Sequence, residues 1–181
     1  MATLKAPVTS ADHIRGPMEA PVTLVEYGDY ECPHCGAAHP IVNLVREHFG
    51  KRLRFVYRHF PMTAVHPHAE SAAETAEFAG ANGVFWEMHE SLFENQDRMS
   101  VSFFFAVAEA LGLSGVALQH ALVTRTYAPK VRSDFLGGVR SGVNGTPCFF
   151  INSERHERSW AYEDLVESIE ARLPAKASVT R

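Results

Sequence analysis

Two strand-like apolar runs flank a helical pattern in the first third of the chain. The run 22–27, VTLVEY, is almost continuously apolar, which predicts a buried strand. Over 32–49 the apolar residues recur at helical spacing, and Gly50 ends the pattern. The run 53–60, LRFVYRHF, alternates as a strand does and stops before Pro61. This order predicts a βαβ unit with two parallel strands.

The middle of the chain has only helical patterns. An alanine-rich segment predicts a helix that begins near Pro67 and ends at glycines. The segments 83–96 and 100–113 each have one apolar stripe, and 115–142 predicts one or two further helices. We therefore expect a long helical block without a strand.

Shorter patterns lie at the two ends. Residues 4–8 predict a short edge strand, because Pro7 fits only at an edge. The segments 147–151, PCFFI, and 155–160, RHERSW, predict two strands around a polar turn, and 162–173 predicts a terminal helix.

The order of these elements predicts an α/β fold with a mixed sheet and an inserted helical domain. We expect residues 1–63 and 143–174 to form the sheet domain and residues 64–142 the helical domain. Residues 175–181 are expected to be a mobile tail.

The amino-acid composition and the N-terminal sequence limit the kinds of partner and the cellular location that we expect. Hydrophobic residues make up 46% of the 181 residues and charged residues 21%, which is typical of a globular protein with a packed core. The net charge of -4 gives no reason to expect nucleic acid as a partner, and no apolar run is long enough for membrane insertion. The N-terminus lacks the apolar core of a signal peptide, which predicts a cytoplasmic protein, or a periplasmic one if an export signal has been removed.

Cys32 and Cys35 stand between the first buried strand and the helix that follows it. Unpaired backbone N–H groups and the helix dipole stabilise a thiolate at a helix start and so favour a lowered pKa for Cys32, while the acidic Asp29 and Glu31 act in the opposite direction. Pro33 suits the first helical turn, and a protonated His34 would stabilise the thiolate further. Cys35, one turn further in, would resolve a mixed disulfide formed at Cys32.

Two other interpretations of this pair are weaker. Half a zinc site would need two more ligands, for which Cys148 and a histidine are the candidates. A structural disulfide between such close positions would close a loop too small to add much stability. A redox pair is the preferred interpretation.

The segments VTLVEYGDYECPHC, YRHFPM, FWEMHESLFENQ and GVNGTPCFFIN, in this order, resemble the DsbA-like branch of the thioredoxin superfamily. The resemblance extends over about residues 12–173. It implies a thioredoxin fold with an inserted α-helical domain, which agrees with the order of the elements.

The resemblance also implies roles for individual residues. Cys32 corresponds to the nucleophile, Pro33 and His34 to the dipeptide that tunes it, and Cys35 to the resolving thiol. Thr146–Pro147 corresponds to a loop with a cis proline, where the backbone of Thr146 would pair with an extended substrate segment.

Glu26 is a carboxylate within an apolar strand, and burial of such a group is costly without a partner or a task. It aligns with an acid that the family keeps beneath the cysteine pair, where it would accept the proton of Cys35. The alternative is a position on the open face of an edge strand.

These patterns predict a thiol-disulfide oxidoreductase that uses Cys32 and Cys35, with no bound cofactor or metal. The resemblance implies a disulfide donor to protein substrates, with a separate redox partner that recycles the pair. A cytosolic disulfide reductase, a non-enzymatic redox-sensing or interaction module and a zinc-binding module remain as alternatives. Cys148 is expected to be a buried, inert thiol that faces away from the site.

Overall fold

The structure, a computed structural model, describes residues 2–174. The predicted tail, 175–181, lies outside the described residues. The strands are β1 (His13–Arg15), β2 (Val22–Gly28), β3 (Leu53–His59), β4 (Cys148–Ile151) and β5 (Glu154–Arg155). They form one mixed sheet in the order β1-β3-β2-β4-β5. Only β2 and β3 are a parallel pair among these neighbours.

Helix α1 (Pro33–Phe49) connects β2 to β3, which confirms the βαβ unit. Between β3 and β4 lie α2 (Ala69–Ala81), α3 (Phe85–Glu94), α4 (Val101–Ala110), α5 (Gly115–Thr124) and α6 (Ala128–Arg140). The chain then returns to the sheet and ends in α7 (Tyr162–Glu170). Two short 3-10 helices, η1 (Gly50–Arg52) and η2 (Gln96–Arg98), follow α1 and α3.

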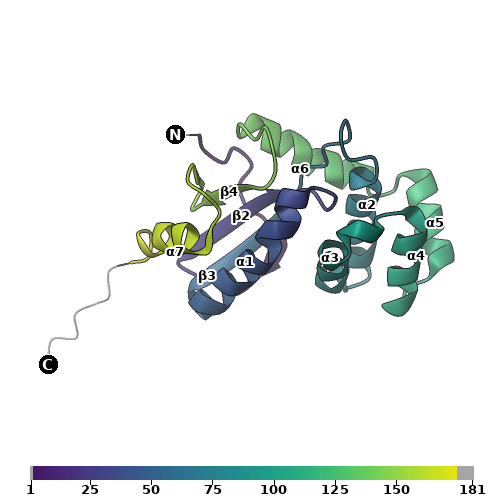
Figure 1. The fold of residues 1–181 in the computed structure, drawn as a ribbon, viewed down its shortest axis with the longest axis horizontal. Coiled ribbons are helices and arrows are strands. Elements are labelled where there is room, and N and C mark those ends of the chain that lie inside the picture. The colour runs from purple at the N-terminus through teal and green to yellow at the C-terminus, as the bar shows by residue number, and fades with distance from the viewer. Residues whose placement is uncertain (1, 175–181) are drawn as a thin grey trace, which may run out of the picture.

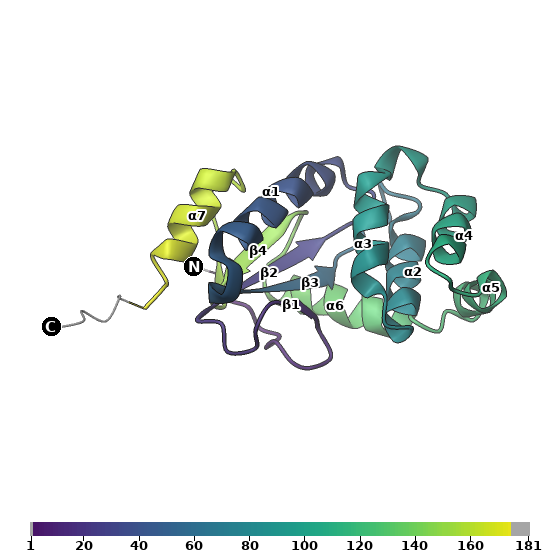
Figure 2. The same ribbon diagram turned by 90° about the horizontal axis from the view of Figure 1, so that it is seen from below.

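Alternation along β2 divides the core into two parts. Leu24 and the residues that share its face pack in one cluster with α1, α3 and α7, and both Cys32 and Cys35 belong to this cluster. Val25 and Tyr27 belong to a second cluster on the opposite face, which α6 covers (Figure 2). Because successive strand residues face opposite sides, β2 contributes to both clusters while it is buried along its whole length.

Helices α2 to α5 lie together beyond one end of the sheet, on the right in Figure 1. Helix α6 contacts both α2 and β3, and so joins the helical layer to the sheet. Close packing requires small residues here, because a Cβ on Gly138 would lie 2.7 Å from Cδ2 of Phe60. The mixed α/β fold with its helical insertion is thus confirmed, while the residue limits of the two domains stay a prediction.

The prediction of a strand at 4–8 was wrong. Thr3 forms an isolated bridge with Glu154, and the edge strand is β1 instead. The carbonyl groups of Ala6 and Pro7 accept hydrogen bonds from the guanidinium of Arg58, at 2.8 and 2.9 Å. These carbonyl groups therefore bind a buried side chain and are not used in strand pairing.

The strand predicted over 155–160 is also much shorter than expected. Only Glu154–Arg155 pairs with β4, and the backbone N–H of His156 still donates to Phe149 at 2.9 Å. Beyond it Arg158 forms ion pairs with Asp164 and Glu167. The chain therefore leaves the sheet after Arg155, and the side chain of Arg158 contacts α7 instead.

Candidate active site

Cys32 and Cys35 lie where β2 leads into α1. Cys32 is the residue before the helix, with extended backbone, and Pro33 occupies the first turn as expected. Both cysteines are free thiols, and both are buried, with 4% of Cys32 and none of Cys35 exposed. Pro33 and His34 are exposed. The pair therefore lies just beneath the surface, with Pro33 and His34 facing solvent.

The two thiols differ in acidity. A hydrogen bond from the Cys35 thiol lowers the pKa of Cys32 to about 5, against the effect of burial. Hydrogen bonds from Thr146 and from the backbone N–H groups of Cys35 and His34 act in the same direction. Burial raises the pKa of Cys35 well above its usual value, and its hydrogen bond to Cys32 adds to the effect. Cys32 is thus a thiolate at neutral pH, while Cys35 keeps its proton.

The loop before β4 completes the site. The Thr146–Pro147 peptide bond is cis, and the carbonyl oxygen of Thr146 lies 3.5 Å from Sγ of Cys32. The hydroxyl oxygen of Thr146 lies 3.7 Å from the sulfur of Met62, and its one rotatable proton serves either this sulfur or the Cys32 thiolate. The loop therefore places a backbone acceptor against the first cysteine.

Glu26 lies within β2, on the sheet face that carries the cysteine pair, and is 2% exposed. Burial, with a smaller contribution from the negative charge of Cys32, raises its pKa to about 8. Its Oε1 has no hydrogen-bond partner among residues 2–174. Glu26 is not on the open face of an edge strand, because β2 pairs with β3 on one side and β4 on the other. A proton can therefore move onto or off this group near neutral pH.

Asp29 and Glu31, two acidic residues near the cysteines, accept hydrogen bonds that hold neighbouring loops in place. Asp29 is buried and accepts hydrogen bonds from the backbone N–H of Glu31 and Met62, each at 2.9 Å, and from Nδ1 of His66 at 2.7 Å. Glu31 accepts from the backbone N–H of His68 at 2.6 Å. Together they attach the segment after β3 to the turn that carries Cys32.

Gln96 also contacts the site, although it is not among the site residues predicted from the sequence. Its Nε2 donates to the carbonyl oxygens of Tyr30 at 2.8 Å and of Cys32 at 2.9 Å. A Cβ on Gly36 would lie 2.0 Å from Oε1 of Gln96, so the glycine makes room for this side chain. Only its place at the end of the motif FWEMHESLFENQ marked this residue in the sequence.

His39, one helical turn beyond Cys35, does not face solvent. It is buried, and its Nε2 lies 2.7 Å from Oε2 of Glu90, a residue of α3. Cys148 is buried in the cluster on the other face of the sheet, which confirms that it points away from the pair.

The chain matches the family model described as Thioredoxin over residues 8–171. It is 45% identical over 158 residues to the Na⁺/H⁺ antiporter NhaA 1 of Salinispora arenicola, and this match covers 87% of the chain but 24% of the antiporter. The chain spans about a quarter of the length of the curated relatives that it matches first.

Solved structures have the same fold. Oxidised BdbD from Bacillus subtilis is 24% identical, with a TM-score of 0.85 over 94% of this chain and 97% of that one. The alpha-DsbA1 protein of Wolbachia pipientis is 18% identical, with a TM-score of 0.80 over 93% of each chain. The chain therefore belongs to the thioredoxin family, and its fold is that of the DsbA-type thiol-disulfide oxidoreductases.

Proposed function

We propose that the protein is a thiol-disulfide oxidoreductase that donates a Cys32–Cys35 disulfide to protein dithiols. The observation that carries the proposal is the contrast between the two thiols, since the pKa of Cys32 is about 5 and that of Cys35 is well above its usual value. A stabilised thiolate favours the reduced pair, and a pair that is stable when reduced is a strong oxidant when it is a disulfide.

In the proposed reaction a substrate thiolate attacks Sγ of Cys32 and breaks the Cys32–Cys35 bond. Cys35 leaves with the bonding electrons and takes up a proton, for which protonated Glu26 is the donor. A second substrate thiolate then attacks the substrate sulfur of the mixed disulfide and releases Cys32 as a thiolate. The substrate loses two electrons, the enzyme gains them, and a separate redox partner must reoxidise the pair.

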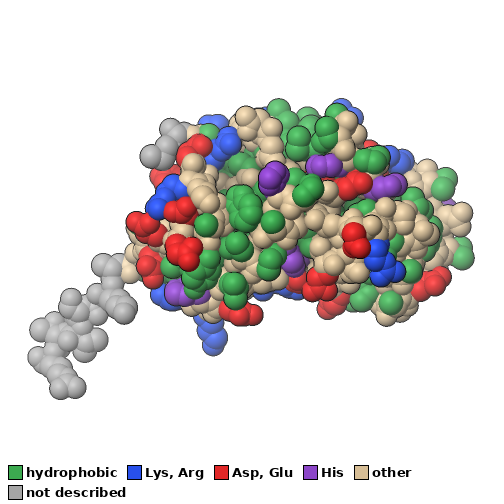
Figure 3. Space-filling model, in the orientation of Figure 1, with side chains coloured by type: hydrophobic (Ala, Val, Ile, Leu, Met, Phe, Trp, Pro, Cys, Tyr) green, Lys and Arg blue, Asp and Glu red, His purple; other side chains and the backbone are tan. Residues whose placement is uncertain are grey.

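Substrate recognition is proposed to use backbone and apolar contacts. Thr146 precedes β4 and would pair with an extended segment of the substrate. A groove of about 630 Å³ lined by Pro61, Phe135 and Leu136, among others, lies beside Met62, which contacts Thr146. Hydrophobic and histidine side chains adjoin on the face around the starts of α1 and α2 (Figure 3). Such a surface suits unfolded chains with varied sequences.

The direction of transfer depends on the compartment. In the cytoplasm the pair would be largely reduced and the protein would act as a disulfide reductase, whereas in the periplasm it would act as a donor. None of the helices in residues 2–174 has the length and apolar character needed to span a membrane.

Oxidised protein mixed with reduced ribonuclease A tests the proposal. We expect stoichiometric formation of ribonuclease disulfides, no transfer by Cys32→Ser, and unchanged transfer by Cys148→Ser, which alters the thiol on the opposite face. An equilibrium with glutathione then measures the potential. Failure of the oxidised protein to transfer its disulfide would overturn the proposal.

The antiporter relatives favour a second candidate, a redox-sensing module that acts on a membrane transporter. Trapping with Cys35→Ser separates the two. An oxidoreductase captures many proteins as mixed disulfides through Cys32, and a dedicated module captures a single partner or none.

A further inference from the structure

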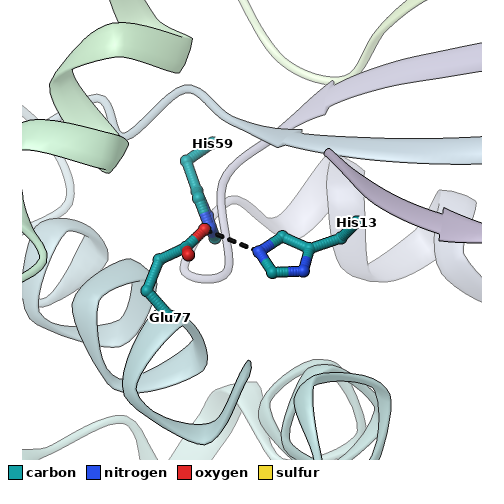
Figure 4. A group of neighbouring side chains, drawn as sticks. All are labelled: His13, His59 and Glu77. Atoms are coloured by element: carbon teal, nitrogen blue, oxygen red, sulfur yellow. Dashed lines mark hydrogen bonds and ion pairs between the residues drawn. The ribbon is translucent and has the colours of Figure 1, made fainter. Parts of the chain in front are cut away.

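Three side chains from separate elements converge away from the cysteine pair. His13 comes from β1, His59 from the end of β3 and Glu77 from α2 (Figure 4). Nε2 of each histidine lies 2.8 Å from the same carboxylate oxygen, Oε1 of Glu77. The three atoms all lie within 4.8 Å of one another. They thus face a common point where the sheet meets the helical layer.

Neighbouring residues hold the two rings in place. The ring of His13 stacks on Phe85, with centroids 3.4 Å apart and 4° between the planes. Gly80 leaves room for this ring, because a Cβ there would lie 3.0 Å from Cε1 of His13. His59 is 1% exposed. Both imidazoles therefore present Nε2 to Glu77 from fixed positions.

The carboxylate of Glu77 is only 8% exposed, so little solvent surrounds it. Burial raises the pKa of Glu77, but hydrogen bonds from His13 and His59 outweigh it and hold the pKa well below its usual value. Nδ1 of His59 is buried and has no hydrogen-bond partner among the described residues.

We propose that His13, His59 and Glu77 form a binding site for a divalent transition-metal ion of the zinc class. Two imidazole nitrogens and one carboxylate oxygen are a ligand set that zinc accepts, with a fourth position left for water. Ligand atoms about 2.0 Å from a tetrahedral ion lie about 3.3 Å from each other. The two histidine nitrogens lie 2.8 Å from the carboxylate oxygen and within 4.8 Å of each other, so shifts of the side chains bring the three atoms to this spacing.

The ion has a route to this site. The side chain of His13 is 17% exposed, against 1% for His59, so entry is from the side of β1. Coordination through Nε2 moves each imidazole proton to Nδ1, and the ion takes the place of two hydrogen bonds to Glu77. Bound metal would link β1, β3 and α2, and would stabilise the contact between sheet and helical layer independently of the proposed exchange reaction.

Zinc chloride titrated into tag-free protein tests the site. The cysteine pair is itself a zinc ligand, so the titration uses the Cys32→Ser/Cys35→Ser background. We expect one ion per chain and a rise in the unfolding temperature. His13→Ala and Glu77→Gln should each weaken binding by about tenfold or more and abolish this rise. His120→Ala, which removes an exposed histidine outside the cluster, is the matched control and should bind like the background.

Cobalt chloride provides a second readout. The expected absorption is that of a nitrogen- and oxygen-ligated ion, without a thiolate charge-transfer band. Unsaturable binding, or equal affinities in the background and in His13→Ala, would overturn the proposal. Because His13 is only half-buried on a short edge strand, its variant decides the question even if Glu77→Gln does not fold.

Discussion

The carbonyl oxygen of Thr146 lies 3.5 Å from Sγ of Cys32, although 114 positions of sequence separate the two residues. The antiparallel pairing of β4 with β2 produces this proximity, because it aligns Cys148 with Tyr27 and so brings the preceding loop next to the start of α1. A side-chain hydrogen bond from Thr146 on this loop lowers the pKa of Cys32, so the acidity of Cys32 depends on the assembled sheet as well as on the CPHC segment.

Thr146→Val tests whether the loop before β4 contributes to the acidity of Cys32. The variant keeps the volume of the side chain but removes the hydroxyl that lowers the pKa of Cys32, so this pKa should rise above its value of about 5. The pH dependence of Cys32 alkylation in the reduced protein measures it. Thr63→Val, at an exposed position next to Met62, should leave the pKa unchanged.

Glu26→Gln tests the proton relay. A glutamine cannot exchange the proton of Cys35, so the step in which Cys35 attacks or leaves should slow by on the order of 100-fold. Rapid mixing with a preformed mixed disulfide at Cys32 measures this step. Glu163→Gln, at an exposed position of α7, is the control, and equal rates in Glu26→Gln and the parent would contradict the relay.

The same substitution should change stability with a defined sign. The folded protein keeps the proton of Glu26 up to a pH of about 8, whereas the unfolded chain loses it near 4.5. The free energy of unfolding therefore falls as pH rises through this window. We expect reduced Glu26→Gln to exceed the parent in stability at a pH of about 8, by on the order of 3–5 kcal/mol, and by much less near a pH of about 5. Denaturant titrations at both values measure the difference.

The effect of Gly36→Ala on the free energy of unfolding should change sign when the side chain of Gln96 is removed. Gly36→Ala would place a methyl group 2.0 Å from Oε1 of Gln96 and displace the amide from the carbonyls of Tyr30 and Cys32, at a cost of about 1–3 kcal/mol. In a Gln96→Ala background the nearest atoms are gone, and Gly36→Ala should instead stabilise α1 by up to about 1 kcal/mol.

Denaturant titration of the four proteins of this cycle measures the reversal. Additive effects of the two substitutions would show that the amide does not position the turn. Loss of the Gln96 amide should also change the alkylation rate of Cys32, which Gln119→Ala, at an exposed site on α5, should not alter.

Arg58 and Asp12 form a buried ion pair with two hydrogen bonds, at 2.7 and 3.0 Å. Arg58→Met should cost about 3–5 kcal/mol, because it leaves a buried carboxylate and two carbonyls without their donor. Hydrogen bonds from Arg58 and Thr9 outweigh burial and lower the pKa of Asp12. Its contribution to stability is therefore present above the unfolded pKa of about 3.8 and is lost as pH falls through the folded value.

A double-mutant cycle with Asp12→Asn isolates the pair. If Arg58→Met costs as much in the Asp12→Asn background as in the parent, the ion pair is not the source of the loss.

Local patterns were sufficient for much of the fold. The apolar run of β2, the helical spacing of α1 and the alternation of β3 each identify an element, because burial of one face imposes its period on the sequence. The errors at 4–8 and 155–160 came from long-range contacts. A local residue pattern does not show that Arg58 donates hydrogen bonds to the carbonyl groups of Ala6 and Pro7. Nor does it show that Arg158 forms an ion pair with α7.

By itself, the sequence determined the element order, the CPHC pair at a helix start and the Thr-Pro loop that resembles its family's, because these depend on residue types at close spacing. The tertiary structure alone decided which distant side chains meet. It brought Gln96 to the turn, paired His39 with Glu90 and converged His13, His59 and Glu77. Such contacts depend on how the helical layer packs against the sheet, and no local period in the chain encodes that packing.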